Sequence, residues 1–245
     1  MSLSELQALV EKHNLPKFTA KQLIDWLYFK RCPDFNLMSN LSKATRQLFT
    51  ENYETGLHAP LKFQTSTDGT KKYLYKSGNG FVETAFIPGR DRATVCISSQ
   101  VGCKMNCSFC QTGKQNFQEN LTAGDIINQI LSLPEYEELS NFVFMGMGEP
   151  MDNYDAVMRC LEIMTSAWGL AMSPTRITVS TIGVIPFMKR FMNETKCNLA
   201  VSMHSPFHDE RLKMMLIEKA YPVSEVLHAL RQHDWSGQRR LSFEY

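Results

Sequence analysis

From residue 93 onward, short apolar segments alternate with amphipathic helical patterns, and this alternation limits the possible folds more than any other feature. The apolar segments are ATVCISS (93–99), NFVFMGMG (141–148), RITVSTIG (176–183), CNLAVSMHS (197–205) and RRLSFEY (239–245). Near-continuous apolar strands joined by helices indicate a parallel sheet covered by helices, with functional loops at the carboxyl ends of the strands. We therefore predict an α/β fold in which five parallel strands form a partial (βα) barrel.

The helical patterns between these strands have recognisable ends. Thr122 is the predicted N-cap of the helix in TAGDIINQILSLP, with Asp125 three residues later. Asn153 is predicted to cap the next helix and Gly169 to end it. Further helices are expected in IPFMKRFMNE (185–194), DERLKMML (209–216) and VSEVLHALRQH (223–233).

Two other regions precede the alternating pattern. Residues 1–55 are helical in pattern, with Thr19 and Ser42 as predicted caps of the second and third helices. From about residue 60 to 100 the period changes to two, and Asp68-Gly69 marks a hairpin tip. The sequence thus predicts a helical accessory domain at 1–55, a β-hairpin connector at 56–92 and the partial barrel at 93–245.

The fifth apolar strand reaches residue 245 with no helix after it. A buried parallel strand normally continues into a covering helix, and without that helix one sheet edge and one flank are left bare. We therefore expect these residues to be a fragment or a natural truncation.

Charge and cysteine content narrow the class of protein. Lys and Arg number 26 against 25 Asp and Glu, so a nucleic-acid site must be a local basic patch. No apolar run is long enough for a transmembrane helix, and MSLSELQALVEKHNLPKF resembles an amphipathic helix rather than a signal peptide. Seven cysteines without an export signal indicate a cytoplasmic protein, in which clustered thiols bind metal more often than they form disulfides.

Three of these cysteines stand close together in SSQVGCKMNCSFCQTG (98–113), at Cys103, Cys107 and Cys110. Zinc sites usually show two separated cysteine pairs, although Cys96 could supply a fourth ligand to such a site. Three thiolates on one loop suit a [4Fe–4S] cluster better, because they hold three irons and leave the fourth open to a chelating ligand. The residues alone favour the cluster but leave zinc and ordinary core cysteines as alternatives.

The triplet C-x₃-C-x-aromatic-C, with Phe109 as the aromatic residue, follows the first strand of a parallel α/β fold. In this context it resembles the radical S-adenosylmethionine (SAM) superfamily. The resemblance implies that the open iron binds SAM, which is then cleaved by electron transfer to a 5′-deoxyadenosyl radical. It also implies that the five parallel strands form a partial radical SAM barrel.

Four further stretches resemble the RNA adenine-C2 methyltransferases of the RlmN family, which modify 23S ribosomal RNA and tRNA. They are VETAFIPGRDRATVCISSQVGC (82–103), FMGMGEPMDNY (144–154), ITVSTIGVIP (177–186) and LAVSMHSPFHDERL (199–212). The resemblance covers essentially the whole chain, and it implies that the N-terminal helical domain helps to hold RNA.

The resemblance also implies a role for each matching position. The cysteine triplet would ligate the cluster, Glu83 would accept a proton, and Cys96 would resolve a protein–RNA crosslink. The positions implied to contact SAM are Gly148, Glu149, Ser180, Ser202, Met203 and His204.

Without the resemblance these residues have ordinary explanations. Glu83 beside Arg90 and Arg92 would be a surface ion pair, and Cys96 in an apolar strand would be a small hydrophobe. The basic residues Lys71, Lys72, Lys76, Arg90 and Arg92 suggest a phosphate-facing patch, for which a solvated surface is the alternative.

The chemistry of adenine explains why such a site needs a radical. C2 of adenine is electrophilic, so direct methyl transfer from SAM fails. In the family, one cysteine takes a methyl group from a first SAM, and a radical made from a second SAM activates that methyl for addition to C2. A base then removes the C2 proton, and the second cysteine forms a disulfide with the first as the product leaves.

The chain departs from this family at one point. The methyl-carrying cysteine and an asparagine that contacts SAM would both lie beyond LSFEY, outside these 245 residues. The chain alone is therefore expected to bind the cluster and SAM but to lack the methyl carrier that complete catalysis needs.

Three other functions compete with adenine-C2 methylation. The sister family that methylates adenine C8 resembles this chain but has a cysteine where Val101 stands, which favours C2. Glycyl-radical activases lack the helical N-terminal unit, and a non-catalytic RNA-binding module would hold zinc in place of the cluster. For the C2 enzyme, the resemblance implies 23S rRNA and tRNA as partners, flavodoxin as an electron donor, a monomer, and no membrane.

Metal content distinguishes the cluster from zinc. We expect anaerobically purified protein to be brown and to hold about four irons per chain, because three thiolates anchor one cubane. Metal and acid-labile sulfide analysis measures this directly. Colourless protein with one zinc per chain would contradict the cluster assignment.

Overall fold

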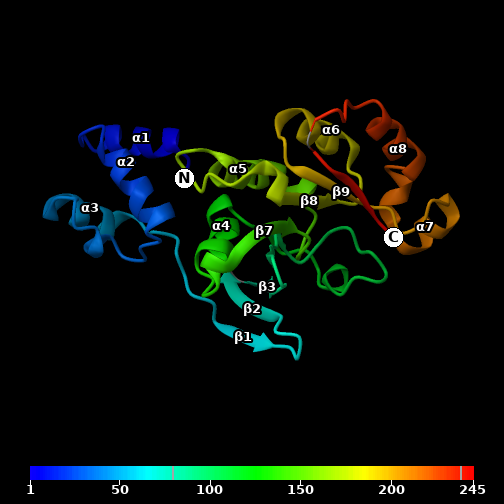
Figure 1. The fold of residues 1–245 in the computed structure, drawn as a ribbon, viewed down its shortest axis with the longest axis horizontal. Helices are drawn as coiled ribbons and strands as arrows, with labels where there is room; N and C mark the ends of the chain where they lie inside the picture. Colours follow the sequence, from blue (N-terminus) through cyan, green and yellow to red (C-terminus); the bar gives the residue numbers. More distant parts are fainter. Residues whose placement is uncertain (79, 238) are drawn as a thin grey trace.

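The structure is a computed structural model that describes residues 1–78, 80–237 and 239–245 (Figure 1). Most of its strands belong to one mixed sheet. In spatial order they are β1 (Lys62–Thr65), β2 (Lys71–Ser77), β3 (Gly80–Ile87), β4 (Ala93–Cys96), β7 (Leu139–Phe144), β8 (Ile177–Thr181), β9 (Asn198–Ser202) and β10 (Leu241–Glu244).

The predicted α/β architecture is confirmed. β4, β7, β8, β9 and β10 pair in parallel in that order, and helices fill the connections. The sheet has β1 and β10 at its two edges within the described residues, so the barrel is open there.

The hairpin strands are part of the main sheet. β1, β2 and β3 pair antiparallel, and β3 also pairs antiparallel with β4. The hairpin strands therefore extend the sheet beyond β4. The predicted boundaries after residues 55 and 92 stay predictions.

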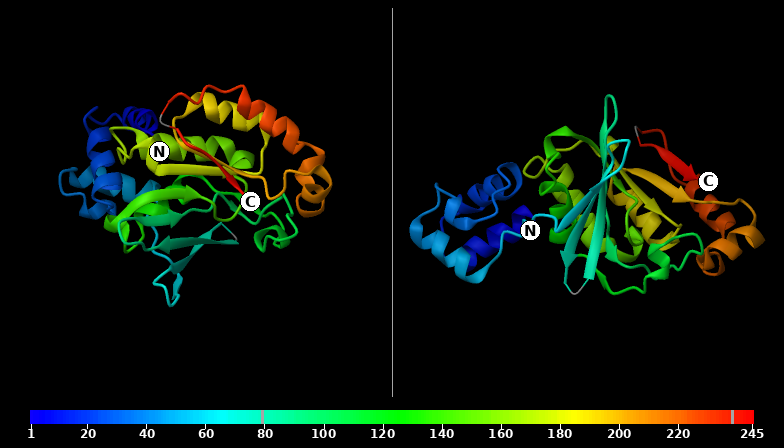
Figure 2. Two further views of the ribbon diagram at one scale, coloured as in Figure 1. Left: turned by 45° about the vertical axis from the view of Figure 1, so that its right-hand side comes forward. Right: turned by 90° about the horizontal axis from the view of Figure 1, so that it is seen from below.

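The helices cover the sheet and form a lobe at one end of the molecule. They are α1 (Leu3–Lys12), α2 (Thr19–Ile24), α3 (Lys43–Asn52), α4 (Ala123–Leu131), α5 (Tyr154–Thr165), α6 (Ile185–Glu194), α7 (His208–Met214) and α8 (Val223–Arg231). Figure 2 shows α1 to α3 at one end and α7 and α8 at the other. No helix in the described part of the chain is long and apolar enough to cross a membrane.

The core lies between the parallel strands and the apolar faces of the helices. On the strands, Phe142, Ile177 and Leu199 are at most 2% exposed. On the helices, the fully buried side chains recur every three or four residues, as the amphipathic patterns predict. They include Ile126, Ile130, Val157, Leu161, Met188, Phe191, Val226 and Leu230.

The N-terminal lobe is anchored by side chains to the helices over the sheet. Arg31 lies 2.7 Å from a carboxylate oxygen of Glu137, and the rings of Tyr28 and Trp168 are 6.2 Å apart. Inside the lobe, Ser42 caps α3 as predicted. Thr19 does not cap α2: it is the first helical residue and is buried, so the prediction of a cap there is wrong.

Of the two helix caps predicted over the sheet, one is confirmed and one is wrong. Thr122 and Asp125 form a reciprocal capping box at α4, as predicted. Asn153 stands at the N-cap position of α5 but does not cap it, because its amide donates to the carbonyls of Ser99 and Leu121.

The predicted end of α5 at Gly169 is wrong, because α5 ends at Thr165. The chain then turns back, and the Leu170 N–H donates to the carbonyl of Ile163 over 2.9 Å. A Cβ at Gly169 would lie 1.9 Å from that carbonyl oxygen, so glycine is required in the turn rather than at the helix end.

Candidate functional site

A cavity of about 240 Å³ opens at the carboxyl ends of the parallel strands. The alternating pattern predicts a site at this edge. The structure brings together there most of the residues singled out from the sequence. They are Cys103, Cys107, Cys110, Gly148, Glu149, Ser180, Ser202 and His204, whereas Glu83, Cys96 and Met203 do not line it.

The cysteines are carried by the loop between two short paired strands, β5 (Gln100–Val101) and β6 (Glu119–Asn120). The Cys110 N–H donates to the carbonyl of Cys107 over 3.0 Å, which curls the loop. The Ser108 N–H donates to the carbonyl of Met214 over 2.9 Å and ties the loop to α7. The loop is thus held at both ends and in the middle.

The donor set of this cavity fits an iron–sulfur cluster. Three thiols line one cavity, and three thiolates anchor three irons of a cubane. All seven cysteines of the chain are free thiols, and burial raises the pKa of Cys107 to about 11. Metal binding replaces that proton, because thiolates are the ligands. Among the described residues, no three His, Cys, Asp or Glu side chains converge as a single-ion site would need.

Gly148 brings main chain against the loop before the cysteines. Its φ is 96°, and a Cβ there would lie 2.5 Å from the Cβ of Gln100. Gln100 is fully buried and accepts a hydrogen bond from the Glu149 N–H over 2.9 Å. Its amide donates to Asp152 over 2.7 Å and to Asn120 over 2.8 Å. Gln100 therefore links the cysteine loop to the segment that presents Glu149.

Glu149 is a buried carboxylate on the wall of the cavity. Its side chain is only 4% exposed and accepts the backbone N–H groups of Met151 and Ile182, each over 3.0 Å. Desolvation raises the pKa of Glu149 to about 7, although these hydrogen bonds oppose the shift. Such a carboxyl is costly to leave ionised without a cation, so it favours a ligand that carries positive charge or N–H donors.

Two strand-end serines share a second carboxylate that the sequence analysis did not single out. The hydroxyl of Ser180 donates to one oxygen of Glu244 over 3.1 Å, and that of Ser202 donates to the other over 2.9 Å. Glu244 ends β10 and lines the same cavity. The three residues form a polar wall that can bind hydroxyl or amino groups of a ligand.

His204 and Met203 are neighbours in the chain, but only His204 lines the cavity. His204 lines the cavity with φ of 56°, and its ring packs edge-to-face on Phe109 with centroids 4.7 Å apart. Burial lowers the pKa of His204, so its ring is neutral at pH 7. Met203 contributes backbone only: its N–H donates to the Glu244 carbonyl and its own carbonyl accepts from Arg211.

A buried arginine holds these strand ends in place. Arg211 on α7 is fully buried and donates to the carbonyls of Ile182, Ser202 and Met203. It also pairs with Glu218, which is itself fully buried. Because Ile182 follows β8 and Met203 follows β9, Arg211 fixes the spacing of two strand ends that form the cavity. No pattern in the sequence indicates this role.

Glu83 and Cys96 lie outside the cavity. The Glu83 carboxylate is about half exposed and pairs with Lys72 over 2.9 Å, not with Arg90 or Arg92. Cys96 ends β4, and desolvation raises the pKa of its thiol to about 11. Its thiol is therefore protonated at neutral pH.

The predicted basic patch around the hairpin is partly neutralised. Lys71 lies 2.6 Å from Glu135, and Lys72 is the partner of Glu83. Paired lysines contribute less to phosphate binding than free ones, so this face carries less net charge than the sequence suggests.

Comparisons with known proteins agree along the whole chain. Residues 1–54 match the ribosomal RNA large subunit methyltransferase N-terminal domain, and residues 97–237 match the radical SAM superfamily. The probable dual-specificity RNA methyltransferase RlmN of Parabacteroides distasonis is 54% identical over 246 residues, covering 100% of this chain and 72% of that protein.

A more distant relative and a solved structure extend the comparison. The dual-specificity RNA methyltransferase RlmN of Syntrophus aciditrophicus is 38% identical over 250 residues, covering 100% of this chain and 72% of that protein. The crystal structure of a radical SAM methyltransferase from Sphaerobacter thermophilus superposes with a TM-score of 0.94 at 35% identity, covering 100% of this chain and 74% of that one.

We expect Arg211→Met to lower the free energy of unfolding by about 3–5 kcal/mol, because it leaves the Glu218 carboxylate buried without its cation. Urea unfolding measures the decrease. Lys213→Met, on the exposed side of the same helix, is the matched control and should stay within about 0.5 kcal/mol of wild type. Equal effects of the two substitutions would show that the buried pair does not support the strand ends.

Proposed function

The chain belongs to the RlmN family of dual-specificity RNA methyltransferases, within the radical SAM superfamily, and on this premise we propose that it serves the methylation of adenine C2 in 23S rRNA and tRNA. The observation that carries the proposal is the shared cavity: the cysteine triplet lines the same cavity as Glu149, Ser180 and Ser202. The thiols suit iron, and the carboxylate and hydroxyl oxygen atoms suit the polar groups of SAM.

The residues singled out from the sequence for the cluster and SAM each have a proposed part. Cys103, Cys107 and Cys110 would hold a [4Fe–4S] cluster, which supplies the electron that cleaves SAM. Glu149 would accept hydrogen bonds from the amino group of SAM, and its segment from Gly148 would approach the ligand through the main chain. The hydroxyls of Ser180 and Ser202, Met203 through its backbone, and His204 would complete the SAM site.

Two residues outside the cavity are proposed to act on RNA. The half-exposed carboxylate of Glu83 is accessible to a bound RNA and would accept the C2 proton. The Cys96 thiol would resolve the crosslink between protein and RNA, forming a disulfide with the methyl-carrying cysteine. Because the pKa of Cys96 is raised, a base must take its proton before it can attack.

We infer from the family resemblance that the methyl-carrying cysteine has no counterpart among these 245 residues. The chain spans 72% of the length of the Parabacteroides relative, so that relative has further sequence. We propose that this chain provides the cluster and SAM sites, and that a cysteine outside it carries the methyl group. Flavodoxin as electron donor, a monomeric state and a cytoplasmic location complete the proposal.

Mapping the methyl group on RNA tests the proposal. Native polypeptide purified from its source would be incubated anaerobically with SAM, a reductant and unmodified 23S rRNA fragments or tRNA. Mass spectrometry of the digested RNA is expected to find 2-methyladenosine. Methyl groups found only at C8 would overturn the assignment, and would instead favour the sister activity. Comparing the two RNAs shows which one is preferred.

We expect Glu149→Gln to weaken SAM binding about 10- to 100-fold, because it removes a charge-assisted hydrogen bond worth about 1.5–3 kcal/mol. Equilibrium dialysis of SAM against cluster-loaded protein under anaerobic conditions measures the change. Glu138→Gln, an exposed substitution far from the cavity, is the control. Unchanged affinity in Glu149→Gln with an intact cluster would remove Glu149 from the SAM site.

A further inference from the structure

A second, larger cavity lies at the amino ends of the parallel strands. It has a volume of about 590 Å³ and is lined by residues that precede or begin the strands. Arg92 precedes β4, Arg176 precedes β8 and Arg240 precedes β10. The cysteines and Glu149 follow the carboxyl ends of strands, so the two cavities lie at opposite ends of the parallel strands. None of the proposed catalytic or SAM-binding residues lines this second cavity.

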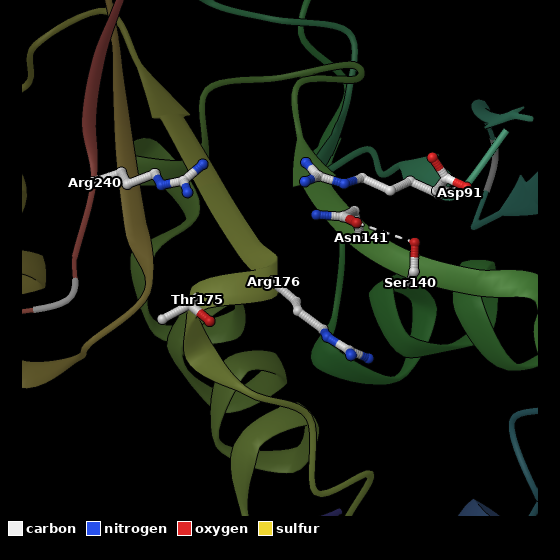
Figure 3. Close-up of a pocket in the computed structure, with 7 residues that line it drawn as sticks. Asp91, Ser140, Asn141, Thr175, Arg176 and Arg240 are labelled. Atoms are coloured by element: carbon white, nitrogen blue, oxygen red, sulfur yellow. Dashed lines mark hydrogen bonds between the residues drawn. The ribbon is translucent and has the colours of Figure 1, made fainter. Parts of the chain in front are cut away.

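The guanidinium N–H groups of Arg92, Arg176 and Arg240 are available to bind a ligand. Among the described residues, none of the three side chains makes a hydrogen bond or an ion pair within the chain. Figure 3 shows Arg240 reaching in from one side and Asn141 facing it from the other. The one acidic residue on the lining is Asp91, whose carboxylate points away from the centre of the cavity in Figure 3.

A neighbouring cavity extends this basic surface. It has a volume of about 500 Å³, and Thr175 lines both cavities. Lys196 and Arg239 line the neighbour, and Asp234 is its acidic residue. Together the two cavities hold five basic residues (Arg92, Arg176, Arg239, Arg240 and Lys196) and two acidic ones (Asp91 and Asp234), a local excess of three positive charges. The whole chain carries a net charge of only +1.

The neighbouring cavity also presents aromatic rings. Trp235 is fixed by a hydrogen bond of 2.8 Å from its ring nitrogen to the Leu230 carbonyl, and His233 packs against it with ring centroids 4.9 Å apart. Both rings line the cavity. A groove that combines arginines with held aromatic rings is typical of surfaces that bind single-stranded nucleic acid, where phosphates meet the cations and bases meet the rings.

We propose that these two cavities form one groove that binds the sugar–phosphate backbone of an RNA strand. The spread of the basic residues over both cavities favours a chain of phosphates over a single small phosphate. The groove would serve as a second RNA-binding surface, separate from the cavity where SAM and the cluster are proposed to bind. It therefore goes beyond the proposed function, and each can fail without the other.

Arginine footprinting tests the groove without any substitution. Native polypeptide purified from its source would be treated with phenylglyoxal, with and without unmodified tRNA or a short single-stranded RNA, and modified arginines would be identified by mass spectrometry. We expect Arg92, Arg176 and Arg240 to react in the free protein and to be protected by RNA. Arg231, exposed on α8 and outside both cavities, should react equally in both states.

Salt dependence of RNA binding gives an independent measurement. We expect the triple substitution Arg92→Gln, Arg176→Gln and Arg240→Gln to weaken binding of the single-stranded RNA at least 10-fold. The slope of log affinity against log salt should become shallower by about 0.7 for each phosphate that the variant no longer neutralises. Arg231→Gln is the matched control, and an unchanged melting temperature verifies that each variant is folded.

Three results would overturn the proposal. The first is equal RNA affinity and salt slope in the triple variant and the control. The second is that the three arginines are already inaccessible to phenylglyoxal in the free native polypeptide. The third is protection by inorganic triphosphate but not by RNA, which would indicate a small-molecule site. SAM binding measured on the same samples stays unchanged in every case, so the proposed function is judged separately.

Discussion

One buried cation organises the cavity. Parallel strands end with carbonyl groups that the sheet no longer pairs, and these groups must find donors where water is excluded. Arg211 donates hydrogen bonds to carbonyls at the ends of both β8 and β9, because a guanidinium carries five N–H donors in a fixed plane. Glu218 balances its charge and also accepts the Val223 N–H at the start of α8. Two strands and two helices thus meet at one ion pair, and the positions of Ser202 and His204 depend on it.

The cavity itself is divided by chemistry. The three thiols come from a single loop, whereas Glu149 follows β7, and Ser180, Ser202 and Glu244 lie at the ends of β8, β9 and β10. The loop is connected to the rest of the cavity through Gln100, which spans from the cysteine side to the Glu149 segment. Glu149 and Glu244 are both short of compensating cations within the described part of the chain, so the oxygen side is prepared for a positively charged ligand. A ligand that bridges metal and carboxylate would satisfy both sides.

The sequence predicted what depends on local pattern and on strand order. The parallel strands follow from their apolar runs, and Ser180 and Ser202 meet because parallel strands end at one edge. Glu244 obeys the same rule and could have been found by it. Arg211 could not, because a charged residue in an amphipathic helix is usually exposed, and its burial depends on carbonyls brought from two distant strands. The end of α5 was also missed. The helix ends at Thr165, and Gly169 lies in the turn that follows, where the chain folds back on Ile163.

The pairing of β3 with β4 has a consequence for the reactive thiols. Since the hairpin strands extend the sheet, β4 is an interior strand with partners on both sides. Edge strands are where chains fray and where foreign strands attach. The strand that leads to the cysteine loop is protected from both. The cysteine loop can therefore bind metal while the strand beneath it keeps its register.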